Sequence, residues 1–363
     1  MTKKILTLVL LTLLGAVLIS SCTSGSLAAA TSWPGITADA DNEMVYLSAG
    51  SQVYAISTKS GSEVWRYPDD ERSDAGRGIT FFAPPAVIGD LVIVGDYKSS
   101  VHAIDADDGR EAWLYMEPRD KFVGQAAFSN DLVFIPSADY HIYALDLNGD
   151  MQFRVETEKS NWASLAANGS TVYAPSMDHN VYAFDASNGN SVWTTDVNGA
   201  VAASPVLDNG VLFIATLNKE ALAIDTADGS ILWRTDVDDF TWAPPAVVGK
   251  MIIVINASGE VFAIDKETGE TAWTADSNGE VTAAPVAVDG GFVVVNHDMD
   301  IVLFDLEGSK VWSNDLDFET GSLPSTPVVV GDLILIPVAQ SSEALLVAFD
   351  VNGNQIWDYI PEN

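Results

Sequence analysis

Aspartates and histidines are the side chains of this sequence best suited to metal binding or proton transfer, and most of them lie in repeated turns. The segments 105–109 (Asp-Ala-Asp-Asp-Gly) and 39–42 (Asp-Ala-Asp-Asn) lack both the Asp-x-Asp-x-Asp-Gly spacing and the closing glutamate of an EF-hand. His141 and His179 occupy equivalent turns, but no third zinc ligand is evident near them. The sequence therefore predicts no metal site, and it offers no Ser-His-Asp arrangement and no glycine-rich phosphate loop.

The single cysteine, Cys22, is placed for covalent attachment of a lipid. Two lysines precede an apolar stretch, residues 5–19, which is too short for a comfortable transmembrane helix and is typical of a signal peptide. The tetrapeptide Ile19-Ser20-Ser21-Cys22 resembles a bacterial lipobox, in which the thiol is lipidated and the chain is cut before the cysteine. An ordinary secretory signal with an incidental cysteine is the alternative. We expect a signal peptide at 1–21, then a lipidated cysteine and flexible tether at 22–32, and an extracytoplasmic protein anchored to the cell membrane or the outer membrane.

Three aromatic residues, Phe82, Trp162 and Trp242, are spaced 80 residues apart and form a candidate binding surface. They fall at equivalent places in alternate units of the repeat described below, each in the connection that precedes the inner strand and enters a central channel, so we expect them near one rim of that channel. Trp33 lies near the corresponding place of the first unit. A ring of exposed aromatic side chains would be a hot spot for protein binding. Packing against a neighbouring unit is the alternative.

The longest irregular connection, residues 66–82, is a second candidate for partner binding. It contains Arg66, Arg72 and Arg77, a notable share of only 17 basic residues. Long loops on a rigid scaffold often carry function, although a merely tolerated insertion fits equally well.

The rest of the chain repeats one unit of ~40 residues, and such a period with strand-type sequence predicts a β-propeller. Each unit has a strand ending in Ala-Ile-Asp or a variant, then a turn glycine, then an aromatic anchor. The aspartate can cap the turn, and the glycine can adopt positive φ. We expect an all-β fold, an eight-bladed β-propeller with four antiparallel strands per blade, spanning residues 33–363. The anchors expected to fill the gaps between blades are Trp65, Trp113, Phe153, Trp193, Trp233, Trp273, Trp312 and Trp357.

Composition limits the classes of partner. The chain has 363 residues, 48% hydrophobic, with 17 basic against 51 acidic residues and a formal net charge of −34. A nucleic-acid partner is excluded because phosphate binding needs a basic face. One cysteine allows no intrachain disulfide. The acidity keeps the protein soluble and can steer basic partners, or it can reflect a salty habitat.

The recurring Ala-x-Asp-x-x-x-Gly-x-x-x-Trp pattern resembles the tryptophan-docking repeat of the pyrroloquinoline-quinone (PQQ) propeller superfamily. In size, unit number and lipobox the chain is similar to the BamB family of outer-membrane assembly lipoproteins. It departs from the pattern at Ser57, which replaces the turn aspartate, and at Phe153, and its surface is more acidic than expected. The quinoprotein dehydrogenases of the superfamily are larger, and many have a vicinal Cys-Cys pair that this chain cannot form.

The resemblance implies a monomeric, non-enzymatic scaffold that binds envelope proteins, with assembly of outer-membrane β-barrel proteins as the specific role if the organism has an outer membrane. It implies no cofactor, because PQQ binding belongs to the larger dehydrogenases. A PQQ-binding oxidoreductase or a propeller that binds a small ligand is the alternative. Since a fold does not establish a cofactor, the site has to decide.

Overall fold

The computed structural model describes residues 34–69 and 78–362, all within one compact unit. The predicted signal peptide and tether, with Cys22 and Trp33, lie outside the described residues, as do Arg72 and Arg77. The described elements are all β-strands, in eight four-stranded antiparallel sheets whose strands are consecutive in the chain. The predicted all-β, eight-bladed propeller is therefore confirmed.

The blades follow one another along the chain. The first four are β1(Gly35–Asp39), β2(Met44–Ala49), β3(Gln52–Ser57), β4(Glu63–Tyr67); β5(Ala86–Ile88), β6(Leu91–Gly95), β7(Val101–Asp105), β8(Glu111–Tyr115); β9(Ala127–Ser129), β10(Leu132–Pro136), β11(His141–Leu145), β12(Met151–Glu156); and β13(Ala166–Ala167), β14(Thr171–Pro175), β15(Asn180–Asp185), β16(Ser191–Asp196). The last four are β17(Val206–Asp208), β18(Val211–Ala215), β19(Glu220–Asp225), β20(Ile231–Asp236); β21(Ala246–Val248), β22(Met251–Ile255), β23(Glu260–Asp265), β24(Thr271–Asp276); β25(Val286–Val288), β26(Gly291–Val295), β27(Asp300–Asp305), β28(Lys310–Asp315); and β29(Val328–Val330), β30(Leu333–Pro337), β31(Leu346–Asp350), β32(Gln355–Tyr359).

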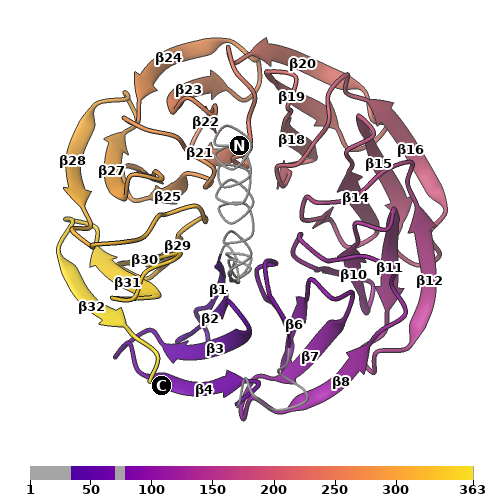
Figure 1. Ribbon diagram of the computed structural model, residues 1–363. Helices are drawn as coiled ribbons and strands as arrows, with labels where there is room; N and C mark the ends of the chain where they lie inside the picture. Colours follow the sequence, from indigo (N-terminus) through magenta and orange to yellow (C-terminus); the bar gives the residue numbers. More distant parts are fainter. Residues whose placement is uncertain (1–33, 70–77, 363) are drawn as a thin grey trace, which may run out of the picture. The chain divides into compact units, whose positions relative to one another are not determined.

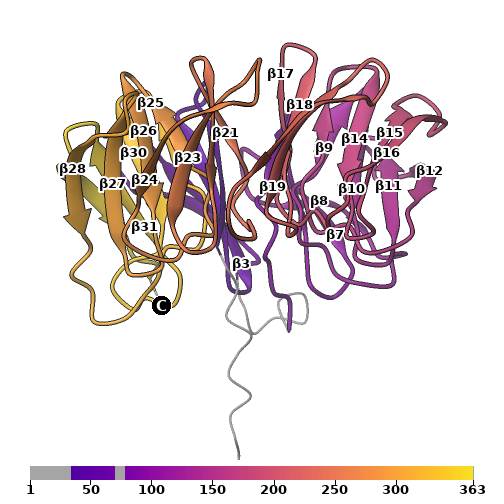
Figure 2. The same ribbon diagram turned by 90° about the horizontal axis from the view of Figure 1, so that it is seen from above.

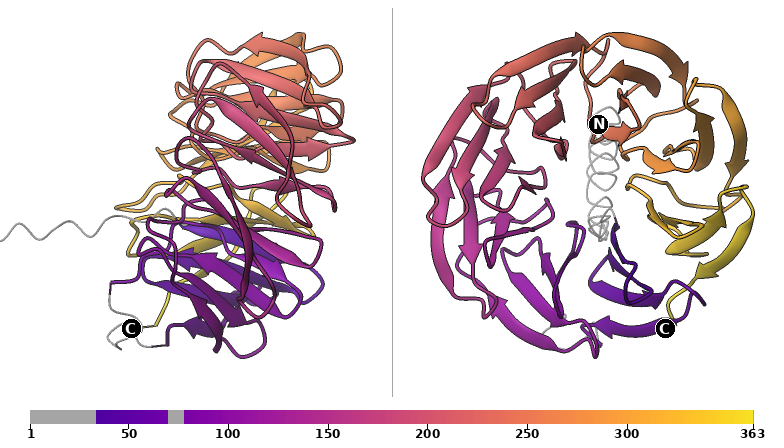
Figure 3. Two further views of the ribbon diagram at one scale, coloured as in Figure 1. Left: turned by 90° about the vertical axis from the view of Figure 1, so that its right-hand side faces the viewer. Right: turned by 180° about the vertical axis from the view of Figure 1, so that it is seen from behind.

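The blades form a ring around a central axis (Figure 1), and we call the space along this axis between the innermost strands the channel. The first strand of each blade is innermost and the fourth forms the rim, as the view from behind also shows (Figure 3). Strands run between the two faces of the ring, so the loops gather at those faces (Figure 2). One face holds the turns between second and third strands and the connections from blade to blade. We call it the connection face.

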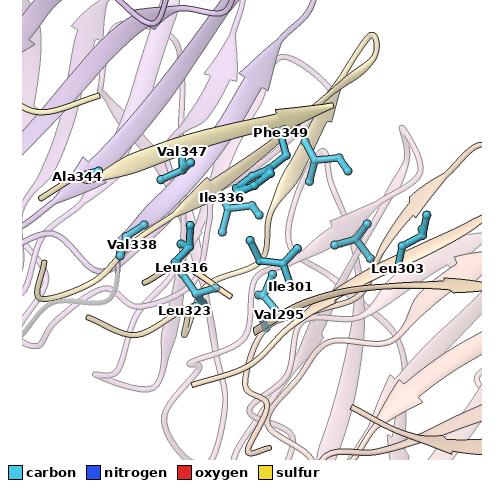
Figure 4. Close-up of a cluster of buried hydrophobic side chains, with 13 residues drawn as sticks. Val295, Ile301, Leu303, Leu316, Leu323, Ile336, Val338, Ala344, Val347 and Phe349 are labelled. Carbon is cyan, nitrogen blue, oxygen red and sulfur yellow. The ribbon is translucent and has the colours of Figure 1, made fainter. Parts of the chain in front are cut away.

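The hydrophobic core lies between the blades. The second and third strands are apolar on both sides, as in Met251–Ile255, because each sheet is covered by a neighbouring sheet on either side. Figure 4 shows one such cluster, in which Val295, Ile301 and Leu303 of the seventh blade meet Ile336, Val347 and Phe349 of the eighth. Each of the eight interfaces between neighbouring blades has such a cluster among the described residues.

The ring closes with whole blades, without exchange of a strand between the ends of the described chain. The closing interface packs Val45 and Tyr54 of the first blade against Leu335 and Leu346 of the eighth. Because no shared sheet joins these two blades, only side-chain contacts and a few hydrogen bonds hold the closure.

Candidate functional site

The aromatic anchors lie on the fourth strands, at the interfaces between blades. Seven are tryptophans, and each donates its Nε1–H to a backbone carbonyl in the next blade. Trp65 donates to Ala106 O at 2.8 Å, and Trp357 donates to Thr58 O of the first blade at 3.2 Å. The other five donors are Trp113, Trp193, Trp233, Trp273 and Trp312, at 2.9–3.1 Å. Phe153 has no donor, but its ring takes the same place against Gly189.

The turn glycine of each unit has a second role that its backbone alone does not reveal. Gly269 has a φ of 75°, and a Cβ added there would lie 2.7 Å from Cγ of Trp233 in the preceding blade. All eight turn glycines have positive φ and contact an anchor ring in this way. Glycine is therefore required both for the turn and for the approach of the aromatic ring.

The turn aspartates cap their own turns. Asp265 Oδ1 accepts the backbone N–H groups of Glu267 and Thr268 at 3.0 and 2.9 Å, and these bonds lower the pKa of Asp265. Asp105, in the segment that weakly resembles a calcium loop, accepts from Asp107 N and Asp108 N in the same manner. These carboxylates are thus used to hold turns.

The three aromatic residues spaced 80 residues apart meet at the channel mouth on the connection face. Phe82, Trp162 and Trp242 line one cavity of about 490 Å³, together with Tyr97, Lys121, Val123, Ala202, Glu280, Thr282 and His297. Each of the three is half-buried and enters from the connection before the second, fourth or sixth blade. The intervening blades contribute the smaller residues Val123, Ala202 and Thr282 at the equivalent positions. Three large rings can therefore share the mouth of the channel.

Small residues just below the mouth allow the connections between blades to pass close to the axis of the ring. Ala163, Ala203 and Ala243 are fully buried, and a Cβ added to Gly124 would lie 2.4 Å from the carbonyl oxygen of Ala163. The following residues are joined around the channel, with Ser164 N donating to Ser204 Oγ at 3.1 Å. The aromatic side chains therefore stand on a tightly packed base.

Lys121 is the cation of this cavity. Its Nζ lies 4.8 Å from the centre of the Tyr97 ring and 6.0 Å from that of Trp162. Tyr97 stacks on Phe82 with ring centres 4.2 Å apart. Across the mouth, Glu280 is the carboxylate of the cavity, and Thr282 Oγ1 lies 2.8 Å from His297 Nε2, within hydrogen-bond distance. The mouth thus combines apolar rings with one cation and one carboxylate.

Arg66 lies at the ring closure. Its guanidinium pairs with Glu63 at 2.7 Å, and Nη1 donates to the carbonyl oxygen of Glu362 at 2.9 Å. Tyr359 donates its hydroxyl to the same Glu63 carboxylate. Arg66 therefore joins the C-terminal segment to the first blade, which gives it a structural role that its place in the long connection did not indicate.

A buried polar cluster around His102 was missed in the sequence. His102 is 3% exposed, and its Nε2 lies 3.3 Å from Asp96 Oδ2. Its Nδ1 lies 3.0 Å from the hydroxyl of Tyr67, which itself donates to Glu111, and 3.5 Å from the Glu111 carboxylate. Because both ring nitrogens face acceptors, the cluster fits a doubly protonated imidazolium. One signal was available in the sequence. Asp96 replaces the neutral residue found at its equivalents, Ser137, Ser176, Thr216, Asn256 and Asn296.

The His102 cluster makes stability depend on pH. Burial lowers the pKa of His102, but hydrogen bonds with Asp96 and Glu111 outweigh it and raise that pKa overall. A raised folded-state pKa contributes stability that is complete below the unfolded value of about 6.5 and is lost as pH rises through the folded value. We expect the free energy of unfolding to fall in that window by at most ~1.4 kcal/mol per pH unit. Urea unfolding at a series of pH values measures the slope. His102→Gln should remove it, and an unchanged slope in that variant would assign the effect to another group.

Comparison with known protein families identifies the family of this chain. A family model described as outer membrane protein assembly factor BamB matches residues 49–176, 141–239 and 177–361. The chain belongs to this family. The matched ranges cover nearly all the described blades, so the BamB-family repeat extends around almost the whole ring.

Solved structures share the BamB-family fold at low sequence identity. BamB from Moraxella catarrhalis has a TM-score of 0.69 and 19% identity, covering 82% of this chain and 93% of that one. The computationally designed protein Ika8 has a TM-score of 0.69 and 14% identity, covering 90% and 96%. Serine/threonine-protein kinase AfsK of Streptomyces griseus is 39% identical over 70 residues, which are 19% of this chain and 8% of the kinase. The two structural likenesses show the fold that the chain shares with these proteins.

Within the described part of the chain, no helix is long and apolar enough to cross a membrane.

Proposed function

We propose that this protein is a non-enzymatic, lipid-anchored scaffold outside the cytoplasm, which binds other envelope proteins through the channel mouth of its propeller. Membership of the BamB family supports a role in the assembly of outer-membrane proteins. The observation that carries the proposal is the convergence of Phe82, Trp162 and Trp242 on one cavity. Rigid aromatic side chains held half-exposed on a packed base are the usual anchors of protein interfaces.

The cavity at the mouth does not fit PQQ. PQQ is a flat tricarboxylate, and its recognition needs several cations or a metal ion together with an aromatic clamp. The mouth offers one lysine, Lys121, and its other charged lining residue is the carboxylate of Glu280. We therefore propose that the protein functions without PQQ.

Capture of partners from the envelope tests the scaffold role. We expect crosslinking of the lipidated protein in its own membranes to yield a component of the β-barrel assembly machinery. A triple variant, Phe82→Ala, Trp162→Ala and Trp242→Ala, should lose most of this capture, because truncating an aromatic hot-spot residue of an interface costs ~2 kcal/mol or more of binding free energy.

A matched control separates binding from folding. Leu232 and Ile356 are exposed on the outer strands, at 51% and 52%, far from the mouth. A Leu232→Ala, Ile356→Ala variant should capture partners as wild type does. Equal capture by the wild-type protein and a folded triple variant would exclude the channel mouth as the docking site.

A further inference from the structure

Lys121 is the lysine that lines the cavity at the channel mouth. Although acidic residues outnumber basic ones by 51 to 17, Lys121 forms no ion pair with any residue that the structure describes. Its ammonium lies over the rings of Tyr97 and Trp162 instead. Lys219, on the same face, differs from it and pairs with Asp239 at 3.3 Å.

The environment of Lys121 holds the charge in place without neutralising it. Contact with the two rings orients the ammonium by a cation–π interaction, which strengthens as the ammonium is shielded from water. Lys121 is half-buried, and the aromatic rings around it exclude part of the water that would otherwise surround its ammonium. A carboxylate of a binding partner is therefore attracted more strongly to this ammonium than to that of an exposed lysine. Glu280 lines the same cavity but forms no ion pair with Lys121.

We infer that the channel mouth binds a protein segment in which an aspartate or glutamate adjoins an aromatic or large aliphatic side chain. The carboxylate pairs with Lys121, and the apolar side chain enters among Phe82, Trp162 and Trp242. Glu280 repels the carboxylate and so directs it to the Lys121 side. This inference rests on the proposed docking role of the mouth and specifies the chemistry of the partner.

The overall charge of the protein limits which partners can present this segment. A net charge of −34 disfavours the approach of a strongly acidic protein at long range. At physiological ionic strength this field is screened beyond ~8 Å, whereas the contact at Lys121 is local and partly dehydrated. The matching partner is therefore neutral or basic overall, with one carboxylate beside an apolar side chain.

Blocked tetrapeptides test the inference directly. Gly-Phe-Glu-Gly, Gly-Phe-Gln-Gly and Gly-Phe-Lys-Gly, each acetylated and amidated, differ only in the charge next to phenylalanine. Their binding to the full chain is measured by saturation-transfer NMR. We expect the glutamate peptide to bind about tenfold more tightly than the glutamine peptide, as one charge-assisted hydrogen bond permits. The lysine peptide should bind most weakly.

Variants assign the preference to one side chain. Lys121→Gln should abolish the tenfold difference between the glutamate and glutamine peptides, Lys121→Arg should retain it, and the control Lys219→Gln should leave it unchanged. Circular dichroism verifies that each variant is folded. Equal binding of the two peptides, tightest binding of the lysine peptide, or no binding of any peptide would overturn the inference. The proposed function has its own test, since envelope capture that depends on Phe82, Trp162 and Trp242 can stand while the charge preference fails.

Discussion

Replacing Gly269 by alanine is expected to destabilise the propeller by ~3–4 kcal/mol, although it adds a single methyl group. Two costs add. At a φ of 75° an L-residue is strained by ~1–2 kcal/mol, and the new Cβ would lie 2.7 Å from Trp233. The Trp233 ring is only 9% exposed and donates to Lys266 O at 3.1 Å, so it cannot move aside freely. Urea unfolding followed by far-UV circular dichroism measures the loss.

Gly249 provides the matched control for Gly269. It has a φ of 60° in the same blade, but a Cβ added there meets no atom within 4 Å. Gly249→Ala should therefore cost only the backbone strain, ~1–2 kcal/mol. Equal losses in the two variants would show that contact with the anchor ring does not constrain the turn glycines.

Replacing Trp357 by alanine is expected to cost about 3 kcal/mol and to loosen the two ends of the chain selectively. Trp357 is the anchor between the eighth and the first blade, and a Cβ added to Gly61 would lie 2.7 Å from its ring. These blades share no sheet, so the closure depends on this anchor, the Arg66–Glu362 contact and the apolar cluster beside them. Hydrogen exchange should therefore quicken in β1–β4 and β29–β32.

Trp113 tests whether the effect belongs to the closure. It is also partly exposed, and it donates to Leu147 O at 2.9 Å between the second and third blades. Trp113→Ala should cost a similar free energy of unfolding, but the terminal blades should keep their protection because the chain itself joins the blades at that interface. A Trp357→Ala variant whose terminal blades exchange as slowly as in wild type would contradict a closure held by side chains.

The architecture could be predicted from the sequence, because the information is local and repeated. Apolar strands, turn aspartates and glycines, and aromatic anchors at 40-residue intervals predicted the eight blades and their four strands, and the structure agrees. The spacing of Phe82, Trp162 and Trp242 likewise predicted that they occupy equivalent connections. Equivalent positions in a closed ring face a common axis, so periodicity alone led to the channel mouth.

Features that join residues from different repeats, or that depart from the repeat, became evident only in the folded structure. It placed Arg66 at the ring closure, beside a C-terminal residue almost 300 positions away. It set the His102 ring among Asp96, Glu111 and Tyr67, each from a different strand or turn. It also placed Lys121 over two aromatic rings, with no ion pair to any of the described residues. Such relations depend on distances between side chains from different strands, loops and blades, and those distances exist only in the folded ring.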